Sequence, residues 1–260
     1  MDGQHQNTRI ERLPFTTDRG AGDRARLGLL VLESDQTMEW EFRDLTHLPG
    51  VSVYHARLAN AMTVTPETLS AMERELPVAA GLLPEYLGVN AIGYGCTSGA
   101  TIIGEDRVAK IIAKAHPGVP STNPLTAAKA AFAALGVSRL GLLTPYTPDV
   151  TEAMQARFEA AGITVKVVGS YFEDSDAVVG KIDAASILKG AISVGSADDV
   201  DGVFISCTSI RAVSVIPKAE KALNKPVTAS NHALAWHMLR LAGITDTNPN
   251  AGRLFQAQLA

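Results

Sequence analysis

Three short stretches of this 260-residue chain occur twice, in the same order and at nearly the same separation. The sequence Arg-Leu-Gly-Leu-Leu at residues 26–30 recurs at 139–143, an offset of 113 residues. The triplet Cys-Thr-Ser at 96–98 recurs at 207–209, an offset of 111, and Asn123 recurs as Asn231, an offset of 108. Matches that share both order and spacing indicate two homologous halves.

Each half alternates short apolar runs with segments of helical periodicity. Apolar runs predict strands at 27–32, 51–55, 91–94 and around Val119, and again at 140–143, 164–168 and 202–205. Helices are expected to end near Leu45, to span 69–86, 104–115 and 150–161, and to surround 187–194. Apolar strands alternating with helices are typical of a parallel sheet covered on both faces. We therefore expect an α/β protein with two pseudo-symmetric flavodoxin-like half-domains, each with a parallel four-stranded sheet, and a cleft between them.

The repeat also sets the expected domain boundaries. Residues 1–25 are polar and carry both charge signs, as in a solvated tail. Residues 26–123 form the first half, which we expect a C-terminal helix at 232–260 to complete. Residues 139–231 form the second half.

The composition indicates which kinds of molecule the protein is expected to bind. The formal net charge is -4, and Lys and Arg are not clustered as nucleic-acid binding requires. No apolar run approaches the ~18 residues of a membrane-spanning helix, and residues 1–23 lack the apolar stretch of a secretory signal. We expect a cytoplasmic protein with a small-molecule partner, without nucleic-acid or membrane binding. The sequence leaves a homo-oligomer open.

Both cysteines of the chain, Cys96 and Cys207, belong to the repeated triplet. A free cysteine is most often a small buried hydrophobic residue. Here each follows a predicted strand, and ligands of open parallel sheets bind at the carboxyl ends of strands. Two halves related by a pseudo-twofold axis would bring the two thiols face to face across one cleft. We therefore expect a catalytic pair.

Two opposed thiols suit proton transfer on both sides of one carbon. One would remove a proton next to a carboxylate while the other donates one, or one thiolate would add to an activated double bond. We expect each triplet to open a helix, whose N-terminus lowers a thiol pKa from its usual ~8.5. The hydroxyls of Thr97, Ser98, Thr208 and Ser209 would add donors for the substrate. Neither scheme needs a cofactor or metal, and no complete dinucleotide, phosphate-loop or metal-ligand motif is present.

These motifs resemble a known family. Gly-Tyr-Gly-Cys96-Thr-Ser-Gly-Ala, Leu-Thr-Pro-Tyr146 and Ser-Cys207-Thr-Ser are similar to motifs of the maleate isomerase and arylmalonate decarboxylase branch of the aspartate/glutamate racemase superfamily. The resemblance covers about residues 27–244, and residues 28–39 also match the first strand and loop of maleate isomerases. Within the branch, the chain most resembles the ectoine-utilisation protein EutA, found with genes of hydroxyectoine degradation.

The resemblance implies roles for individual residues. Cys96 matches the nucleophile or base of maleate isomerases, and Cys207 matches the second acid or base. The decarboxylases keep only the second cysteine, so two cysteines argue against decarboxylation. Thr97, Ser98 and Tyr146 match residues that bind the substrate carboxylate.

Asp35 departs from the family pattern, because maleate isomerases carry a substrate-binding Asn there. A carboxylate at this position would repel a second substrate carboxylate and accept a cation or a hydroxyl. The alternative is that Asp35 caps the following helix.

The leading hypothesis is a cofactor-independent racemase or isomerase of small carboxylates in ectoine or hydroxyectoine catabolism. A maleate cis-trans isomerase is the alternative within enzymes. A non-catalytic binding protein of the same fold and a redox sensor with a reversible disulfide are the alternatives from other classes.

Overall fold

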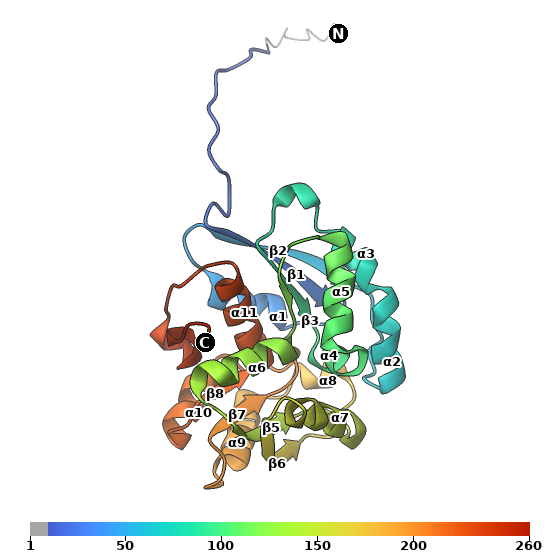
Figure 1. The fold of residues 1–260 in the computed structure, drawn as a ribbon, viewed down its shortest axis with the longest axis vertical. Coiled ribbons are helices and arrows are strands. Elements are labelled where there is room, and N and C mark those ends of the chain that lie inside the picture. The colour runs from blue at the N-terminus through green and yellow to red at the C-terminus, as the bar shows by residue number, and fades with distance from the viewer. Residues whose placement is uncertain (1–9) are drawn as a thin grey trace, which may run out of the picture.

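The two halves of the sequence form two parallel sheets of four strands each. The computed structural model describes residues 10–260, and its strand orders are β2-β1-β3-β4 and β6-β5-β7-β8. All neighbouring strands are parallel. The sheets lie one above the other, and helices cover both (Figure 1). This confirms the predicted α/β class and the two equivalent four-stranded sheets.

The central strands of each sheet are almost fully buried, which explains their uninterrupted apolar sequences. The first sheet contains β1 (Ala25–Leu32), β2 (Val51–Leu58), β3 (Ala91–Gly95) and β4 (Ser121–Thr122). The second contains β5 (Arg139–Thr144), β6 (Thr164–Ser170), β7 (Gly202–Ile205) and β8 (Val227–Ala229). Strand β4 begins two residues after Val119, where we expected a strand. Pro120 has no N–H to donate, although its carbonyl accepts from Ile92 N (3.0 Å).

Helices connect the strands in the expected alternation. They are α1 (Met38–Thr46), α2 (Pro66–Ala71), α3 (Leu76–Gly81), α4 (Thr97–Ile103), α5 (Glu105–Ala115), α6 (Pro124–Leu135), α7 (Pro148–Glu159), α8 (Asp176–Val179), α9 (Ala184–Gly195), α10 (Ile216–Leu223) and α11 (Ser230–Leu241). Short 3₁₀ turns lie at Met72–Arg74, Glu85–Leu87, Pro249–Ala251 and Leu254–Gln256.

The single helix expected over residues 69–86 is wrong. The segment contains α2, a 3₁₀ turn, α3 and a second 3₁₀ turn. Pro77 occupies one of the first positions of α3, where a missing N–H is tolerated. The same residue would remove a hydrogen bond from the interior of one continuous helix, so the chain starts a new helix there.

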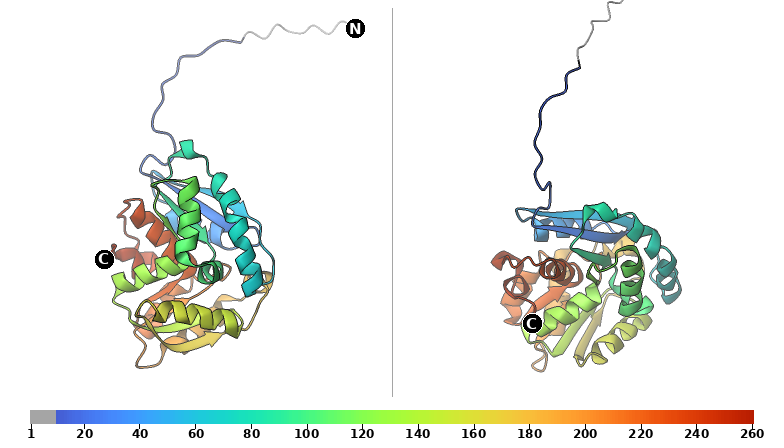
Figure 2. Two further views of the ribbon diagram at one scale, coloured as in Figure 1. Left: turned by 45° about the vertical axis from the view of Figure 1, so that its right-hand side comes forward. Right: turned by 45° about the horizontal axis from the view of Figure 1, so that its top comes forward.

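The C-terminal helix α11 packs against β3 and α1 of the first half and against α6. Figure 2 shows it beside these elements and away from α7 and β6. Its packing supports the proposal that a C-terminal segment completes the first half. The helix is shorter than expected, ending at Leu241, and Gly243 follows with a φ of +77°. Arg240 holds the segment after α11 against that helix by donating hydrogen bonds to the carbonyls of Ile244, Asp246 and Ala257.

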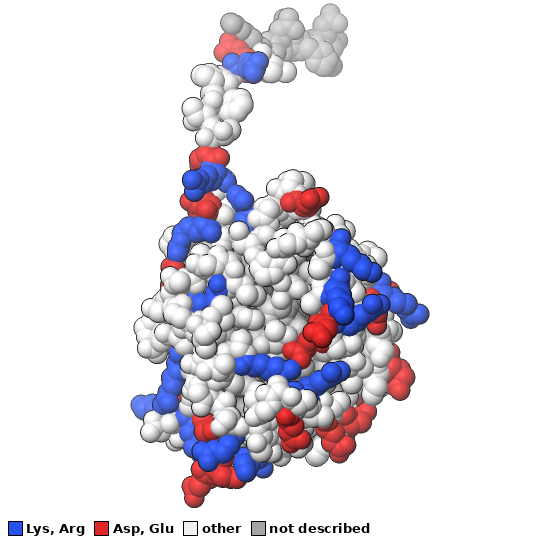
Figure 3. Space-filling view, viewed as in Figure 1, with Lys and Arg blue, Asp and Glu red and all other residues white. Residues whose placement is uncertain are grey.

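The surface charges are mixed. On the face shown in Figure 3, Lys and Arg side chains lie in several separate places among Asp, Glu and uncharged residues. Among the described residues, no helix is long and apolar enough to cross a membrane.

Three phenylalanines form an aromatic cluster that includes a strand of the second sheet. Phe132 from α6, Phe158 from α7 and Phe204 from β7 have ring centroids 5.6–5.8 Å apart in tilted or edge-to-face contacts. All three are at most 1% exposed. Because Phe204 lies on the strand that leads to Cys207, this cluster fixes the position of that strand end.

Replacing Phe204 by Ala should lower the free energy of unfolding by about 3–5 kcal/mol, because it removes buried apolar area and leaves a cavity. The matched control is Phe15→Ala, the same change at a side chain that is 78% exposed. Denaturant unfolding of both variants measures the difference. Equal stabilities of the two variants would contradict the assigned core.

Candidate active site

A small pocket lies between the two halves at the carboxyl ends of the central strands. Its lining includes Cys96, Thr97 and Ser98 from the first half and Tyr146, Cys207 and Thr208 from the second. The other lining residues are Leu32, Asn60, Ala61, Thr63, Val64, Thr68, Leu69, Met72 and Asp176. The structure thus brings six of the eight predicted site residues to one pocket, whereas Asp35 and Ser209 lie outside its lining.

Cys96 lies between β3 and α4 and caps that helix with its own sulfur. Its Sγ accepts a hydrogen bond from Gly99 N (3.2 Å) and lies 3.6 Å from the Ser98 Oγ. A side chain at Gly99 would collide with the Tyr94 hydroxyl, so glycine keeps this turn tight enough to reach the sulfur. Burial raises the pKa of Cys96 to about 11, although the Ser98 and Gly99 hydrogen bonds oppose the shift.

Cys207 does not open a helix, so that part of the sequence prediction is wrong. It has a φ of +99°, and the next helix, α10, begins at Ile216. A non-glycine residue with positive φ is uncommon and marks a tight turn. The turn directs the Ser209 N–H toward the Cys207 sulfur. Burial, followed by the negative charge of Asp176, raises the pKa of Cys207 above its ordinary value.

One hydroxyl joins the two cysteine triplets. The Ser230 Oγ accepts a hydrogen bond from the Thr97 hydroxyl (2.8 Å) and another from the Cys207 N–H (3.0 Å). Ser230 is fully buried at the start of α11. It therefore links the residue after the first cysteine to the backbone of the second.

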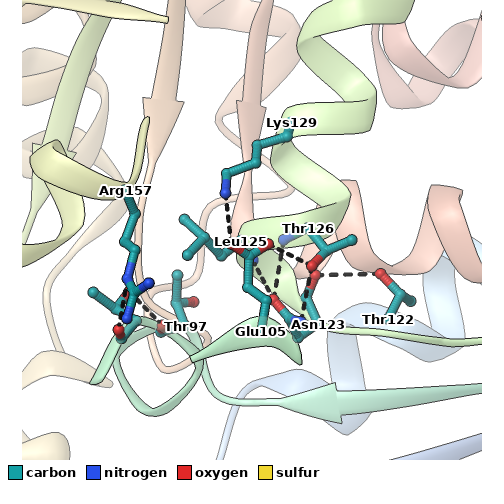
Figure 4. A network of polar contacts seen from close by, with 9 residues as sticks. Thr97, Glu105, Thr122, Asn123, Leu125, Thr126, Lys129 and Arg157 are labelled. Carbon is teal, nitrogen blue, oxygen red and sulfur yellow. Dashed lines mark hydrogen bonds and ion pairs between the residues drawn. The ribbon is translucent and has the colours of Figure 1, made fainter. Parts of the chain in front are cut away.

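The repeated asparagines have different partners. Asn123 caps α6 by accepting from the N–H groups of Leu125 and Thr126, and its amide contacts the network around Glu105 (Figure 4). Asn231 instead donates to the Glu41 carboxylate (2.7 Å) and to the Thr208 carbonyl (2.8 Å).

Glu41 is a buried residue that the sequence did not single out. Its second oxygen accepts from Val213 N (2.8 Å), and burial raises its pKa to about 7. Through Asn231 it holds the backbone of the second triplet, at Thr208. In the sequence, Glu41 is simply an acidic residue on an amphipathic helix. The sequence therefore gives no indication that Glu41 pairs with Asn231, which lies 190 residues away.

A contact between the halves also holds α4. In Figure 4, Arg157 of α7 points to the end of α4, where its Nε donates to the Thr101 carbonyl (3.2 Å). The Thr101 hydroxyl in turn donates to the Thr97 carbonyl (2.9 Å). The second half thereby supports the helix that Cys96 caps.

Tyr146 follows β5 and lies close to both thiols. Its hydroxyl accepts from the Ser206 Oγ (3.4 Å), and it is 2% exposed. Burial, followed by the charge of Cys207, raises its pKa well above the ordinary value. Tyr146 is therefore a neutral hydrogen-bonding group at neutral pH.

Asp35 lies two residues before Thr37, the N-cap residue of α1, and holds the start of that helix. Its Oδ1 accepts from the N–H groups of Thr37 and Met38, both at 2.7 Å. Burial raises its pKa, opposed by these two hydrogen bonds and by the Thr208 hydroxyl. The geometry matches the capping alternative, since Asp35 lies behind Thr208 and not in the pocket lining.

Asp176 is the acidic residue that the pocket does contain, and sequence reasoning missed it. It begins α8, soon after β6, and it is 7% exposed. Ser209 lies behind it and donates from its Oγ to the Asp176 carboxylate (3.3 Å). The sequence feature that could have identified Asp176 is its position a few residues after the end of β6 in the second sheet.

The described residues contain no group of three or more His, Cys, Asp or Glu side chains arranged for a metal ion. What the pocket offers is two thiols, several hydroxyls and one carboxylate. Such a set can transfer protons or add a thiolate to a substrate.

Comparison with known proteins identifies a family. A family profile described as arylmalonate decarboxylase matches residues 43–255. The maleate isomerase of Nocardia farcinica is 28% identical over 249 residues, which cover 90% of this chain and 97% of that protein. The arylmalonate decarboxylase of Bordetella bronchiseptica is 31% identical over 140 residues, but the match covers only 53% of this chain and 58% of that protein.

Solved structures share the fold over nearly the whole chain. A maleate isomerase variant from Pseudomonas putida S16 with maleate has a TM-score of 0.82 at 24% identity, covering 90% of this chain and 98% of that one. A cysteine-to-serine variant of the Nocardia farcinica maleate cis-trans isomerase, with a covalently bound succinylcysteine intermediate, has a TM-score of 0.80 at 26% identity. That match covers 89% of this chain and 98% of the isomerase.

Both thiols should react slowly with iodoacetamide at neutral pH in the ligand-free protein, because raised pKa values keep them protonated. The alkylation rate should keep rising to pH 9.5, whereas urea-unfolded protein should show half-titration near ~8.5. Mass spectrometry of the Cys96→Ser and Cys207→Ser variants assigns the rates to each thiol. A plateau below pH 8 in the folded protein would contradict the raised pKa values.

Proposed function

The chain is an enzyme of the arylmalonate decarboxylase family, and we propose that it is a cofactor-independent racemase or isomerase of small carboxylates that uses Cys96 and Cys207 as its catalytic pair. The observation that carries this proposal is the shared pocket, which both thiols line from opposite halves. A pair of thiols flanking one substrate carbon is the arrangement that acid–base isomerisation requires.

The proposed reaction balances without any added reagent. One cysteine, as thiolate, removes the proton from a carbon next to the substrate carboxylate, and the electron pair moves onto that carboxylate. The other cysteine, as thiol, donates a proton to the opposite face of the same carbon. The first thiol then holds the proton that was removed, and the second is left as thiolate, so the pair is ready for the reverse direction.

Four of the remaining predicted site residues would bind the substrate. Thr97 and Ser98 lie in the first turn of α4, where backbone N–H groups lack partners within the helix. Together with Tyr146 and Thr208 they would hold the substrate carboxylate beside the thiols. Ser209 does not line the pocket, and its hydroxyl would instead position Asp176 through a hydrogen bond.

The second candidate is a maleate cis-trans isomerase, favoured by the end-to-end likeness to such enzymes. There a thiolate would add to the double bond and form a C–S bond. Rotation about the resulting single bond and breakage of the C–S bond would give the other isomer. The succinylcysteine bound to the Nocardia farcinica enzyme supports a covalent route in that relative.

For the physiological substrate we propose ectoine, hydroxyectoine or one of their breakdown products, transformed in the cytoplasm. The overall resemblance of the sequence to an ectoine-utilisation protein motivates this choice. Ectoine and hydroxyectoine carry one carboxylate and a cationic amidinium group, and maleate carries two carboxylates.

Cys96→Ser and Cys207→Ser should each lower turnover by about 10²–10⁴-fold, because a hydroxyl is a far weaker acid than a thiol. The assay follows hydroxyectoine, ectoine and maleate by proton NMR in D₂O and scores both isomerisation and exchange at the carbon next to the carboxylate. Unfolding curves of the variants control for folding. Full activity of either variant would contradict the paired mechanism.

Tyr146→Phe should weaken substrate binding more than it slows the chemical step, because the phenol is neutral at working pH. The loss of one hydrogen bond to a charged group is worth about 1.5–3 kcal/mol, which predicts a rise in KM of about tenfold or more. Steady-state kinetics separate KM from kcat. An unchanged KM would remove Tyr146 from the substrate site.

A further inference from the structure

Asp176 places a carboxylate in the pocket that holds the two thiols. Two connecting segments fix its position. Asp176 N donates to the Met62 carbonyl (3.3 Å), and Val64 N donates to the Asp174 carbonyl (2.9 Å), so a loop of the first half pairs with a loop of the second. The carboxylate is therefore part of the closed pocket and not of a free surface loop.

Hydrogen bonds from two serine hydroxyls act on the ionisation of Asp176. The Asn60 Oδ1 accepts from Ser34 N (3.1 Å), which leaves the Asn60 amide nitrogen to donate to the Ser34 Oγ (2.8 Å). The Ser34 hydroxyl must then donate to Asp176 (2.8 Å). The Ser209 hydroxyl donates to the other carboxylate oxygen (3.3 Å). Burial raises the pKa of Asp176, and these two hydrogen bonds oppose the shift because both oxygens act as acceptors, which favours the ionised carboxylate.

This negative charge has no cationic partner within the described part of the chain. None of the ion pairs there includes Asp176, and the side chains that contact it, Ser34 and Ser209, are neutral. A second buried carboxylate, Asp35, interacts with it and has the same sign, because the charge of Asp176 is among the causes that raise the pKa of Asp35. A buried charge is costly unless it is paired, so the pocket is electrostatically complementary to a cation.

We propose that Asp176 is a specificity-determining residue that binds a cationic nitrogen group of the substrate, an ammonium or amidinium, and rejects a second carboxylate. This inference rests on the proposed function, because it assigns one end of the same pocket. The substrate carboxylate would lie by the cysteine triplets and the cationic group by Asp176.

The same contact would prepare the thiols for reaction. The charge of Asp176 is among the causes that raise the pKa values of Cys96 and Cys207. A bound cation would offset that charge and make either thiolate easier to form. A dicarboxylate would do the opposite, since it adds a second negative charge beside the first.

The test compares two ligands that differ at one end. Maleate is the dicarboxylate, and cis-4-aminobut-2-enoate keeps one carboxylate and the cis double bond but ends in an ammonium group. Calorimetric titration measures the Kd of each ligand. The wild-type protein should prefer the aminobutenoate, and Asp176→Asn should shift the ratio of the two Kd values toward maleate by at least about tenfold, because the like-charge repulsion is gone.

The matched control is Asp35→Asn, which also neutralises a buried carboxylate but outside the pocket lining. Asn caps a helix about as well as Asp, so this variant should stay folded with the wild-type ratio. If wild-type protein prefers maleate, or if Asp35→Asn alone shifts the ratio, the assignment to Asp176 is overturned. Thermal unfolding checks that Asp176→Asn is folded.

The binding test is separate from the test of catalysis. Titrations of the Cys96→Ser, Cys207→Ser double variant should keep the wild-type ligand preference, since the charge of Asp176 is unchanged. Active single cysteine variants with intact preference would defeat the proposed function and leave the charge selection standing. If the cysteine variants are inactive but the wild-type protein shows no preference between the two ligands, the proposed function stands and the charge selection by Asp176 is defeated.

Discussion

The hydroxyl of Ser230 joins the two cysteine triplets and helps to hold the two halves in register. It accepts from Thr97, beside the first cysteine, and from the backbone of Cys207. A pocket with two buried thiols on opposite walls works only if the walls stay at a fixed separation. A hydrogen bond fixes heavy atoms to within a few tenths of an ångström, and these two share one acceptor that is fully buried. The relation between the cysteines therefore depends on α11, the element that follows the last strand of the second sheet.

The duplicated motif has diverged in its local structure, which makes the two thiols chemically unequal. Cys96 caps α4 and accepts from Gly99 N, whereas Cys207 lies in a left-handed turn. The repeated asparagines differ in the same way, one capping α6 and the other binding Glu41. At Cys207 the charge of Asp176 comes directly after burial among the influences on the pKa, whereas at Cys96 the pKa-lowering hydrogen bonds from Ser98 and Gly99 rank ahead of it. Cys96 is accordingly the easier thiol to ionise in the ligand-free pocket.

The pocket is poorly suited to a thiolate until a ligand arrives. Burial is the largest cause of the raised pKa at both cysteines, and the charge of Asp176 adds to it at each of them. A ligand that brings a positive charge would reverse the second effect, so that substrate binding and activation of the base are one event. This couples the proposed selectivity to the proposed chemistry, since a ligand with the wrong charge would leave the thiols protonated.

Sequence alone determined the features that repeat or that depend on neighbours along the chain. The duplicated triplets and apolar strands specified two parallel sheets, and the rule that ligands bind at strand ends brought Cys96 and Cys207 together. The prediction of one helix over residues 69–86 was wrong because Pro77 starts a new helix. The prediction of a helix directly after Cys207 was wrong because the backbone of Cys207 has a positive φ. Asp35 and Asp176 show what the sequence could not predict. Both follow strand ends, but only the packing of the two halves decides that Asp35 lies behind Thr208 while Asp176 enters the pocket. Contacts such as Ser34 with Asp176, or Glu41 with Asn231, join residues 142 and 190 positions apart. No local pattern encodes such contacts, since they arise only when the sheets have docked.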